Sequence, residues 1–488
     1  MFLASAKNLA QADLFNLGAF NQSSPTYVNG IIDTNTTWTA ANSPYIVSSN
    51  ILVETGATLT IEPGVTVKFA GKYYLMVKGN LKAQGNSSSL ITFTSNAPSP
   101  SWGDWEGIQT SEYDANLNLN YCKIQYANTA VYSAEADTEI SNSEFSMNSI
   151  GISVKWYYRY YHTGRNISGT ISKNSIASND LGIKIDIHYD VRGGLRIEDN
   201  EIAYNWEGMK ISFFHLSGFV LSVVRNRISL NGQVGVEMLG SIYEGSFVNM
   251  TQNCITFNDN VGIAFVLWGY PEILRLVAKD NDLHNNKVYD FLVSQPLGEE
   301  SFDYTLDVGE NYWGTTNTTL VDSKIYDFYD DYKLGKANYV PLLTSSLESR
   351  YPDAVLHRLK PRVSIASPVN GTSVTSSDIG LIWSSERAGI DHYEVRLDDS
   401  TWTNVVGTAD SFTFSGLGNG PHKVEVKAVD RLFGSSVASV NFIAAIPPSQ
   451  PQQPDLTPLV YIAIAILIAV GSTRAYSKWR NRSRKTKM

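Results

Sequence analysis

The sequence predicts an all-β protein: a right-handed parallel β-helix solenoid, then a β-sandwich, then one C-terminal transmembrane helix. Three observations predict this order: a repeat of 26 to 28 residues in the middle of the chain, closely spaced short strands after it, and an apolar stretch before a basic tail. The predicted divisions are a residual signal or N-terminal segment at 1–29, the β-helix at 30–345, a linker at 346–361, the sandwich at 362–445, a Pro/Gln-rich linker at 446–456, the transmembrane helix at 457–473 and a basic cytoplasmic tail at 474–488.

The repeat has a fixed frame, Asn-x-Ile-x-x-Asn, followed by Gly and an aliphatic residue. Its runs alternate apolar and polar residues and are too short for helices, so each coil consists of short strands and turns. Stacked coils, roughly 4.8 Å apart, place equivalent residues above one another. We therefore expect two buried aliphatic columns, one of Ile176, Ile202, Ile228 and Ile255 and one of Ile183, Met209, Val236 and Ile263.

The Asn and Gly residues of the frame are interpreted as structural. Both residue types tolerate positive φ, so we expect them to form the turns between strands. Stacked Asn side chains also hydrogen-bond along their column, as amide ladders do in other stacked sheets.

Three segments carry a family resemblance: Ile61–Phe69, the Asn-x-Ile coils, and the closing Asn311-Tyr-Trp-Gly314. They resemble right-handed β-helix proteins of archaeal and bacterial cell surfaces, within the broad pectate-lyase-like group that includes the NosD type. The resemblance covers about residues 30–345 and implies the fold. It does not imply one activity, because the group holds lyases, hydrolases, epimerases, adhesins and structural spikes.

The second unit has about seven short strands with turn signals between them, which is typical of a β-sandwich. Residues 417–430 resemble the late strands of Ig-like or fibronectin-III-like modules, which usually act as spacers.

The segment 457–473 is uncharged, and seven cations without an acid follow it. By the positive-inside rule the tail is cytoplasmic and the body is extracellular, in a single-pass protein of the cell membrane. Residues 1–6 are interpreted as the stub of a signal peptide. Seven sequons are candidate glycosylation sites on an external body: Asn21, Asn35, Asn86, Asn166, Asn249, Asn317 and Asn370.

Composition narrows the choice of partners. The net charge is −9 even though the tail is basic, so the body is acidic and nucleic acid is not an expected ligand. No metal or other cofactor is expected, because closely spaced His or Cys pairs are missing from the sequence. The carboxylates of Asp327, Asp330 and Asp331 could bind Ca²⁺, but a solvated cap explains them better. Cys122 and Cys254 lie several coils apart, so we expect two buried thiols and no disulfide.

One outward-facing column is the candidate site. With Ile183, Ile185 and Ile187 inside, Asp186 and His188 point outward. In register on neighbouring coils, Tyr157, Phe214 and Trp268 continue this line of rings, and aromatic faces suit sugar rings. The predicted carbohydrate-binding residues are therefore Tyr157, Asp186, His188, Phe214 and Trp268.

Three functions stay open. The first is a membrane-anchored surface protein that binds polysaccharide or serves as a structural or adhesive component. The alternative is a polysaccharide lyase or glycoside hydrolase acting in the β-helix groove; Asp186, His188, Asp190 and Glu237 are the nearby titratable groups, but no catalytic residue is assigned. Metal delivery, as in the NosD type, is the third.

Overall fold

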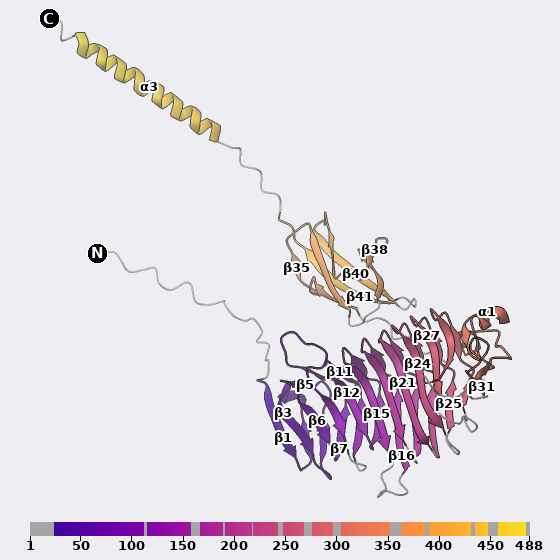
Figure 1. The fold of residues 1–488 in the computed structure, drawn as a ribbon. Helices are drawn as coiled ribbons and strands as arrows, with labels where there is room; N and C mark the ends of the chain where they lie inside the picture. Colours follow the sequence, from indigo (N-terminus) through magenta and orange to yellow (C-terminus); the bar gives the residue numbers. More distant parts are fainter. Residues whose placement is uncertain are drawn as a thin grey trace.

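The computed structural model describes residues 24–111, 115–157, 166–188, 191–216, 218–242, 247–267, 276–295, 304–351, 363–385, 390–430, 435–447 and 457–484. Most of the described elements are strands. They form a right-handed parallel β-helix and a small C-terminal β-module (Figure 1). The predicted fold class is confirmed to this extent.

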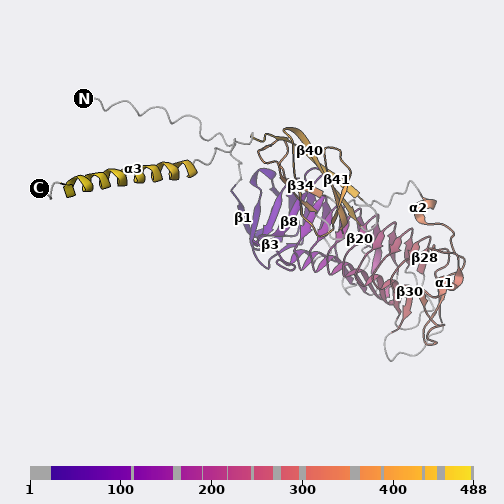
Figure 2. The same cartoon turned by 90° about the horizontal axis from the view of Figure 1, so that it is seen from above.

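The β-helix winds through three rows of parallel strands, which stack coil upon coil (Figures 1 and 2). The long row contains β1 (Thr26–Ile32), β3 (Tyr45–Val53), β6 (Tyr74–Val77), β9 (Gly107–Thr110), β12 (Thr129–Ala134), β15 (Ile150–Tyr157), β18 (Leu181–His188), β21 (Glu207–Leu216), β24 (Val234–Ile242), β27 (Val261–Leu267) and β30 (Tyr289–Ser294). The short row contains β5 (Thr66–Phe69), β8 (Ile91–Ser95), β11 (Cys122–Gln125), β14 (Glu144–Ser146), β17 (Ser175–Ala177), β20 (Glu201–Ala203), β23 (Arg227–Ser229), β26 (Cys254–Thr256) and β29 (Asp282–His284). The third row contains β2 (Thr36–Trp38), β4 (Thr58–Ile61), β7 (Asn80–Gln84), β10 (Asn116–Asn120), β13 (Asp137–Ser141), β16 (Asn166–Ser172), β19 (Arg192–Glu198), β22 (Phe219–Val224), β25 (Phe247–Thr251) and β28 (Leu276–Lys279).

The core of the β-helix is built from the aliphatic columns that the repeat predicts. Ile176, Ile202, Ile228 and Ile255 pair in register along the short row and are fully buried. The second column, from Ile183 to Ile263, pairs in the same way along the long row. Both predicted columns are confirmed. They form because side chains alternate along each strand, so every second residue points into the core.

Two continuous ladders of asparagine side chains run along the solenoid. In each ladder, the Oδ1 of one Asn accepts hydrogen bonds from the backbone N–H and the Nδ2 of the Asn one coil earlier. Asn226 is typical: its Oδ1 lies 3.0 Å from both the N and the Nδ2 of Asn200. The first ladder contains Asn174, Asn200, Asn226, Asn253, Asn281 and Asn311, and the second contains Asn148, Asn179, Asn205, Asn231, Asn258 and Asn286. The predicted amide ladder is thus confirmed, and there are two.

The predicted reason for the frame's Asn and Gly residues is wrong in one respect. Positive φ falls on the residue before each ladder Asn, as at Asp199 (φ 56°) and Tyr204 (φ 59°). Gly208, by contrast, is needed for space: a Cβ there would lie 2.4 Å from the carbonyl oxygen of Gly235 on the next coil. The residue before each ladder Asn adopts the left-handed conformation, and the side-chain amide of the Asn forms hydrogen bonds with backbone groups of the turn.

The second ladder ends on a carboxylate. The Oδ1 of Asp290 accepts from the N and the Nδ2 of Asn286, at 3.0 and 2.8 Å. Burial raises the pKa of Asp290 to about 6, although the hydrogen bonds from Asn286 and the charge of Lys324 lower it. Asp290 lies opposite the frame's Gly262, and its Oδ1 takes over the acceptor role that an Asn of a further coil would have, at the cost of a desolvated charge.

The last coils are closed by β31 (Thr305–Asp307), α1 (Thr318–Asp322), β32 (Ile325–Tyr326), β33 (Lys336–Asn338) and α2 (Leu347–Arg350). The chain then folds back: the N–H of Leu347 donates to both carboxylate oxygens of Asp282 at 3.0 Å, and Tyr351 donates to Asp280 at 2.7 Å. Asp327, one of the three carboxylates considered for Ca²⁺, accepts instead from the backbone N–H groups of Tyr329 and Ala337.

The β-module has its own core. Its eight described strands form two sheets: β34 (Val363–Ser367), β36 (Ile379–Ser385) and β39 (Ser411–Phe414) in one, and β35 (Ser373–Val374), β37 (Ile390–Leu397), β38 (Thr403–Val406), β40 (Gly420–Asp430) and β41 (Ser435–Ala444) in the other. Trp383 and Tyr393 pack edge to face between the sheets, with ring centres 5.3 Å apart. The Ig-like or fibronectin-III-like assignment stays a prediction.

The predicted C-terminal helix is present as α3 (Thr457–Arg484). It runs past the apolar stretch and through Arg474 and Lys478. Within the part of the chain that the structure describes, no helix combines the length and the apolar character needed to cross a membrane. The predicted transmembrane span at 457–473 is therefore not supported.

The two cysteines do not form a disulfide, as predicted. Cys122 is fully buried, and burial raises the pKa of its thiol to about 12. Cys254 is only half-buried, so the prediction of two buried thiols is wrong for this residue.

We predict that the ladder is a major source of stability. Asn226→Ala removes the acceptor for Asn200 and the donor for the carbonyl of Ile197. The variant should lose about 3–5 kcal/mol of unfolding free energy, because several buried polar groups lose their partners at once. Urea unfolding followed by circular dichroism measures this loss. Asn249→Ala, at a half-buried position on β25, is the control and should stay within about 0.5 kcal/mol; equal losses for both variants would contradict a special role of the ladder.

We predict that Asp290, on which the second ladder ends, makes the stability of the protein depend on pH. The folded-state pKa of Asp290, about 6, lies above the unfolded value, so the folded state binds more protons between about pH 4 and 6. The free energy of unfolding therefore falls as pH rises through this window. Asp290→Asn keeps an acceptor without the charge and should be more stable than the wild type by about 2–3 kcal/mol at pH 8. The difference should vanish near pH 4, and a constant difference across the range would show that the charge is not its cause.

The two thiols should also differ in reactivity. A thiol reagent such as Ellman's reagent should modify Cys254 in the native protein and Cys122 only after denaturation, because the thiolate is the reactive form. Mass spectrometry of tryptic peptides identifies the modified residue, and rapid labelling of native Cys122 would contradict its burial.

Candidate functional site

The outer face of the long row is the candidate site, because its side chains are free of the core and stack in register. One outward position can be followed through ten successive coils, and its chemistry changes along the way. It reads Ile31, Leu52, Met76, Gln109, Tyr132, Ser153, Lys184, Lys210, Glu237 and Ala264. The face is therefore apolar in the first coils and polar in its centre.

The central zone holds the predicted ring pair. Tyr157 pairs in register with His188, and their ring centres lie 4.8 Å apart with planes tilted by 33°. The His188 Nε2 lies 2.6 Å from Asp186 Oδ1, and each of these two side chains keeps about 18% of its surface exposed. One coil thus provides a ring and a carboxylate that orients it, while the preceding coil provides the second ring.

A lysine and a tyrosine border the ring pair. The Lys155 Nζ lies 4.8 Å from the centre of the Tyr157 ring, and a hydrogen bond with Tyr157 raises the pKa of Lys155. Tyr132 stands one coil earlier and is half-buried, and burial raises the pKa of its hydroxyl. Both groups are therefore in their protonated forms at neutral pH and offer hydrogen-bond donors at the surface.

The next coils along the face carry an ion pair between Lys210 and Glu237. Lys210 Nζ lies 2.6 Å from Glu237 Oε2. Burial lowers the pKa of Lys210, but the hydrogen bond and charge of Glu237 outweigh burial and the pKa is raised. This pair fixes two long side chains across neighbouring coils and gives the centre of the face a mixed charge.

The remaining predicted site residues are less completely described. Phe214 pairs in register with His188, so its backbone continues the predicted line. Trp268 and Asp190 lie outside the described residues. The structure thus brings Tyr157, Asp186 and His188 together, while the register of Trp268 stays a prediction.

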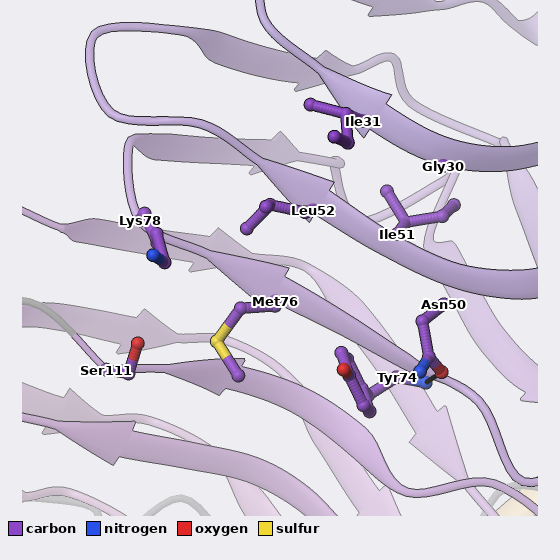
Figure 3. A pocket seen from close by; sticks show the side chains of 9 residues that line it. All are labelled: Gly30, Ile31, Asn50, Ile51, Leu52, Tyr74, Met76, Lys78 and Ser111. Atoms are coloured by element: carbon purple, nitrogen blue, oxygen red, sulfur yellow. Dashed lines mark hydrogen bonds between the residues drawn. The ribbon is translucent and has the colours of Figure 1, made fainter.

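A groove of about 330 Å³ opens at the apolar end of the face (Figure 3). Ile31, Leu52 and Met76 lie on three successive coils and form its apolar floor. Asn50, Tyr74, Lys78 and Ser111 border it. Sequence reasoning missed this groove, although Ile31, Leu52 and Met76 occupy the outward positions of their strands and would have revealed it once the register of the first coils was known.

Within the described ranges, no group of three or more His, Cys, Asp or Glu side chains has the arrangement to hold a metal ion. Of the sequons, Asn35, Asn86, Asn166, Asn317 and Asn370 are exposed and Asn249 is half-buried, while Asn21 lies outside the described residues.

Comparison with known proteins agrees with the fold. Residues 30–182 match a family described as the pectate-lyase like beta helix domain. A stretch of 55 residues is 46% identical to Protein bark beetle of Drosophila melanogaster; it makes up 11% of this chain and 2% of that protein.

Two solved structures show weak similarity. The Dettilon tailspike protein has a TM-score of 0.26 and 13% identity, over 84% of this chain and 74% of that chain. An engineered protein has a TM-score of 0.16 and 16% identity, over 26% of each chain. At these scores the fold assignment continues to rest on the strand pairing described above.

Proposed function

We propose that the chain is a cell-surface β-helix protein that binds polysaccharide along the outer face of the long row. The observation that carries this proposal is the Tyr157–His188 ring pair, oriented by Asp186 and bordered by Lys155. A pyranose ring offers an apolar C–H face and polar edges, and this arrangement offers ring faces beside donors and an acceptor. A flat, stacked sheet also suits a polymer, because equivalent positions recur at each coil.

A surface location is part of the proposal. It is supported by the five exposed sequons, because glycosylation requires accessible Asn side chains in an exported protein. It does not depend on the C-terminal helix as an anchor.

A polysaccharide-processing enzyme is the second candidate. The 2.6 Å contact between Asp186 and His188 favours it, because a carboxylate-oriented imidazole beside a lysine and a tyrosine can move protons. Product analysis of any polysaccharide that binds distinguishes this candidate from simple binding: new reducing ends indicate hydrolysis, and new reducing ends together with unsaturated ends indicate elimination.

We predict that Tyr157→Ala weakens binding to a polysaccharide selected on a glycan array by about 1–3 kcal/mol, by analogy with stacking on other ring ligands. The melting temperature should change little, because Tyr157 is half-buried on the outer face. Calorimetric titration and thermal unfolding measure the two effects. Val220→Ser is the control, since Val220 is 42% exposed on the third row and should leave binding unchanged. A large melting loss for Tyr157→Ala without any glycan ligand would defeat the proposal.

A further inference from the structure

We propose that the apolar groove of the first coils is a terminal subsite of the same face, selective for a sugar unit that carries an ester-linked acyl or methyl group. This inference rests on the proposed function, because it takes the polysaccharide to lie along the long row. It adds what the ring pair does not provide, namely a preference among polysaccharides.

The groove lies on the same row of outward positions as the central zone. Met76 pairs in register with Gln109, and Gln109 with Tyr132, which stands next to Lys155 and Tyr157. Two coils separate Met76 from Tyr132, or roughly 10 Å. A polymer that contacts the Tyr157–His188 pair and runs along the solenoid axis therefore reaches the groove within a few sugar units.

The chemistry of the floor differs from that of the centre. The same outward position that holds Lys184 and Lys210 further along holds Ile31, Leu52 and Met76 here. Ile31 is 66% exposed and Leu52 and Met76 are half-buried, so a ligand can contact all three. Hydroxyl groups of an unmodified sugar would lose water on this floor without gaining a partner, whereas an acetyl or methyl group would be buried favourably.

The size and the border of the groove fit one modified unit. A volume of about 330 Å³ lies at the small end of ligand pockets, which begin at about 300 Å³. Polar atoms stand at its edges rather than on its floor, in Asn50, Lys78 and Ser111 (Figure 3). The sugar ring can thus bond at the border while its ester group points to the floor.

The test compares polysaccharides with and without their ester groups. Partially acetylated glucomannan, acetylated xylan and methyl-esterified pectin are each titrated against the full chain before and after mild alkaline saponification. At least one esterified form should bind about tenfold more tightly than its saponified form, which is the order of discrimination that one methyl-sized group gives in an apolar pocket.

Variants assign the preference to the groove. The double variant Leu52→Ser, Met76→Ser should bind both forms of each acetylated polysaccharide equally, with the affinity of the wild type for the deacetylated form, because deacetylation leaves a neutral hydroxyl. Tyr157→Ala should weaken both forms by the same factor and keep the preference. Val220→Ser is the matched control for an exposed apolar side chain, and melting temperatures verify that all variants fold.

Each other outcome has a distinct meaning. Equal binding of esterified and saponified forms by the wild type, or a preference that survives in the double serine variant, overturns this inference and leaves the proposed function standing. If none of the preparations binds in either form, this inference falls, and the glycan array decides the proposed function separately.

Discussion

The hydrogen bond from one asparagine to the next is the interaction on which the β-helix depends. Each coil must turn without exposing its backbone, and it does so because the amide of the next coil accepts from both the backbone and the side chain of the preceding Asn. The bonds lie in a buried, low-dielectric environment, where they are strong when complete and costly when broken. This requirement repeats in each coil from Asn148 to Asn311, where it holds the turns of neighbouring coils in register.

Once the ladders and the aliphatic columns set the register, the outer face of the long row can vary. Core positions have to be apolar and of fitting size, but an outward position only has to avoid its neighbours. The same column can therefore hold Leu52 in the first coils, Tyr132 in the middle and Lys210 further on. A solenoid separates stability from recognition in this way, and both proposals for binding place the ligand on the face that the ladders leave free.

The closing end shows how the repeat stops. The second ladder ends on the carboxylate of Asp290, and the chain folds back to Asp282 through the N–H of Leu347. Burial raises the pKa of each carboxyl to about 6. The end of the second ladder thus places a carboxylate where it is poorly solvated, whereas the first ladder ends on the neutral amide of Asn311, which donates to the carbonyls of Ala278 and Val308.

The sequence by itself determined the period, the strand direction and the two aliphatic columns, because buried positions must recur at fixed spacing in every coil. It also placed Tyr157, Asp186 and His188 on one outward face, since alternation within a strand follows directly from its inward residues. Only the tertiary structure decided why Gly208 is glycine, that the carboxylate of Asp290 accepts from the last Asn of the second ladder, and that Ile31, Leu52 and Met76 line a groove. These features depend on which atoms of one coil contact the next coil. Such contacts form only when the coils stack, so the sequence of a single coil does not reveal them.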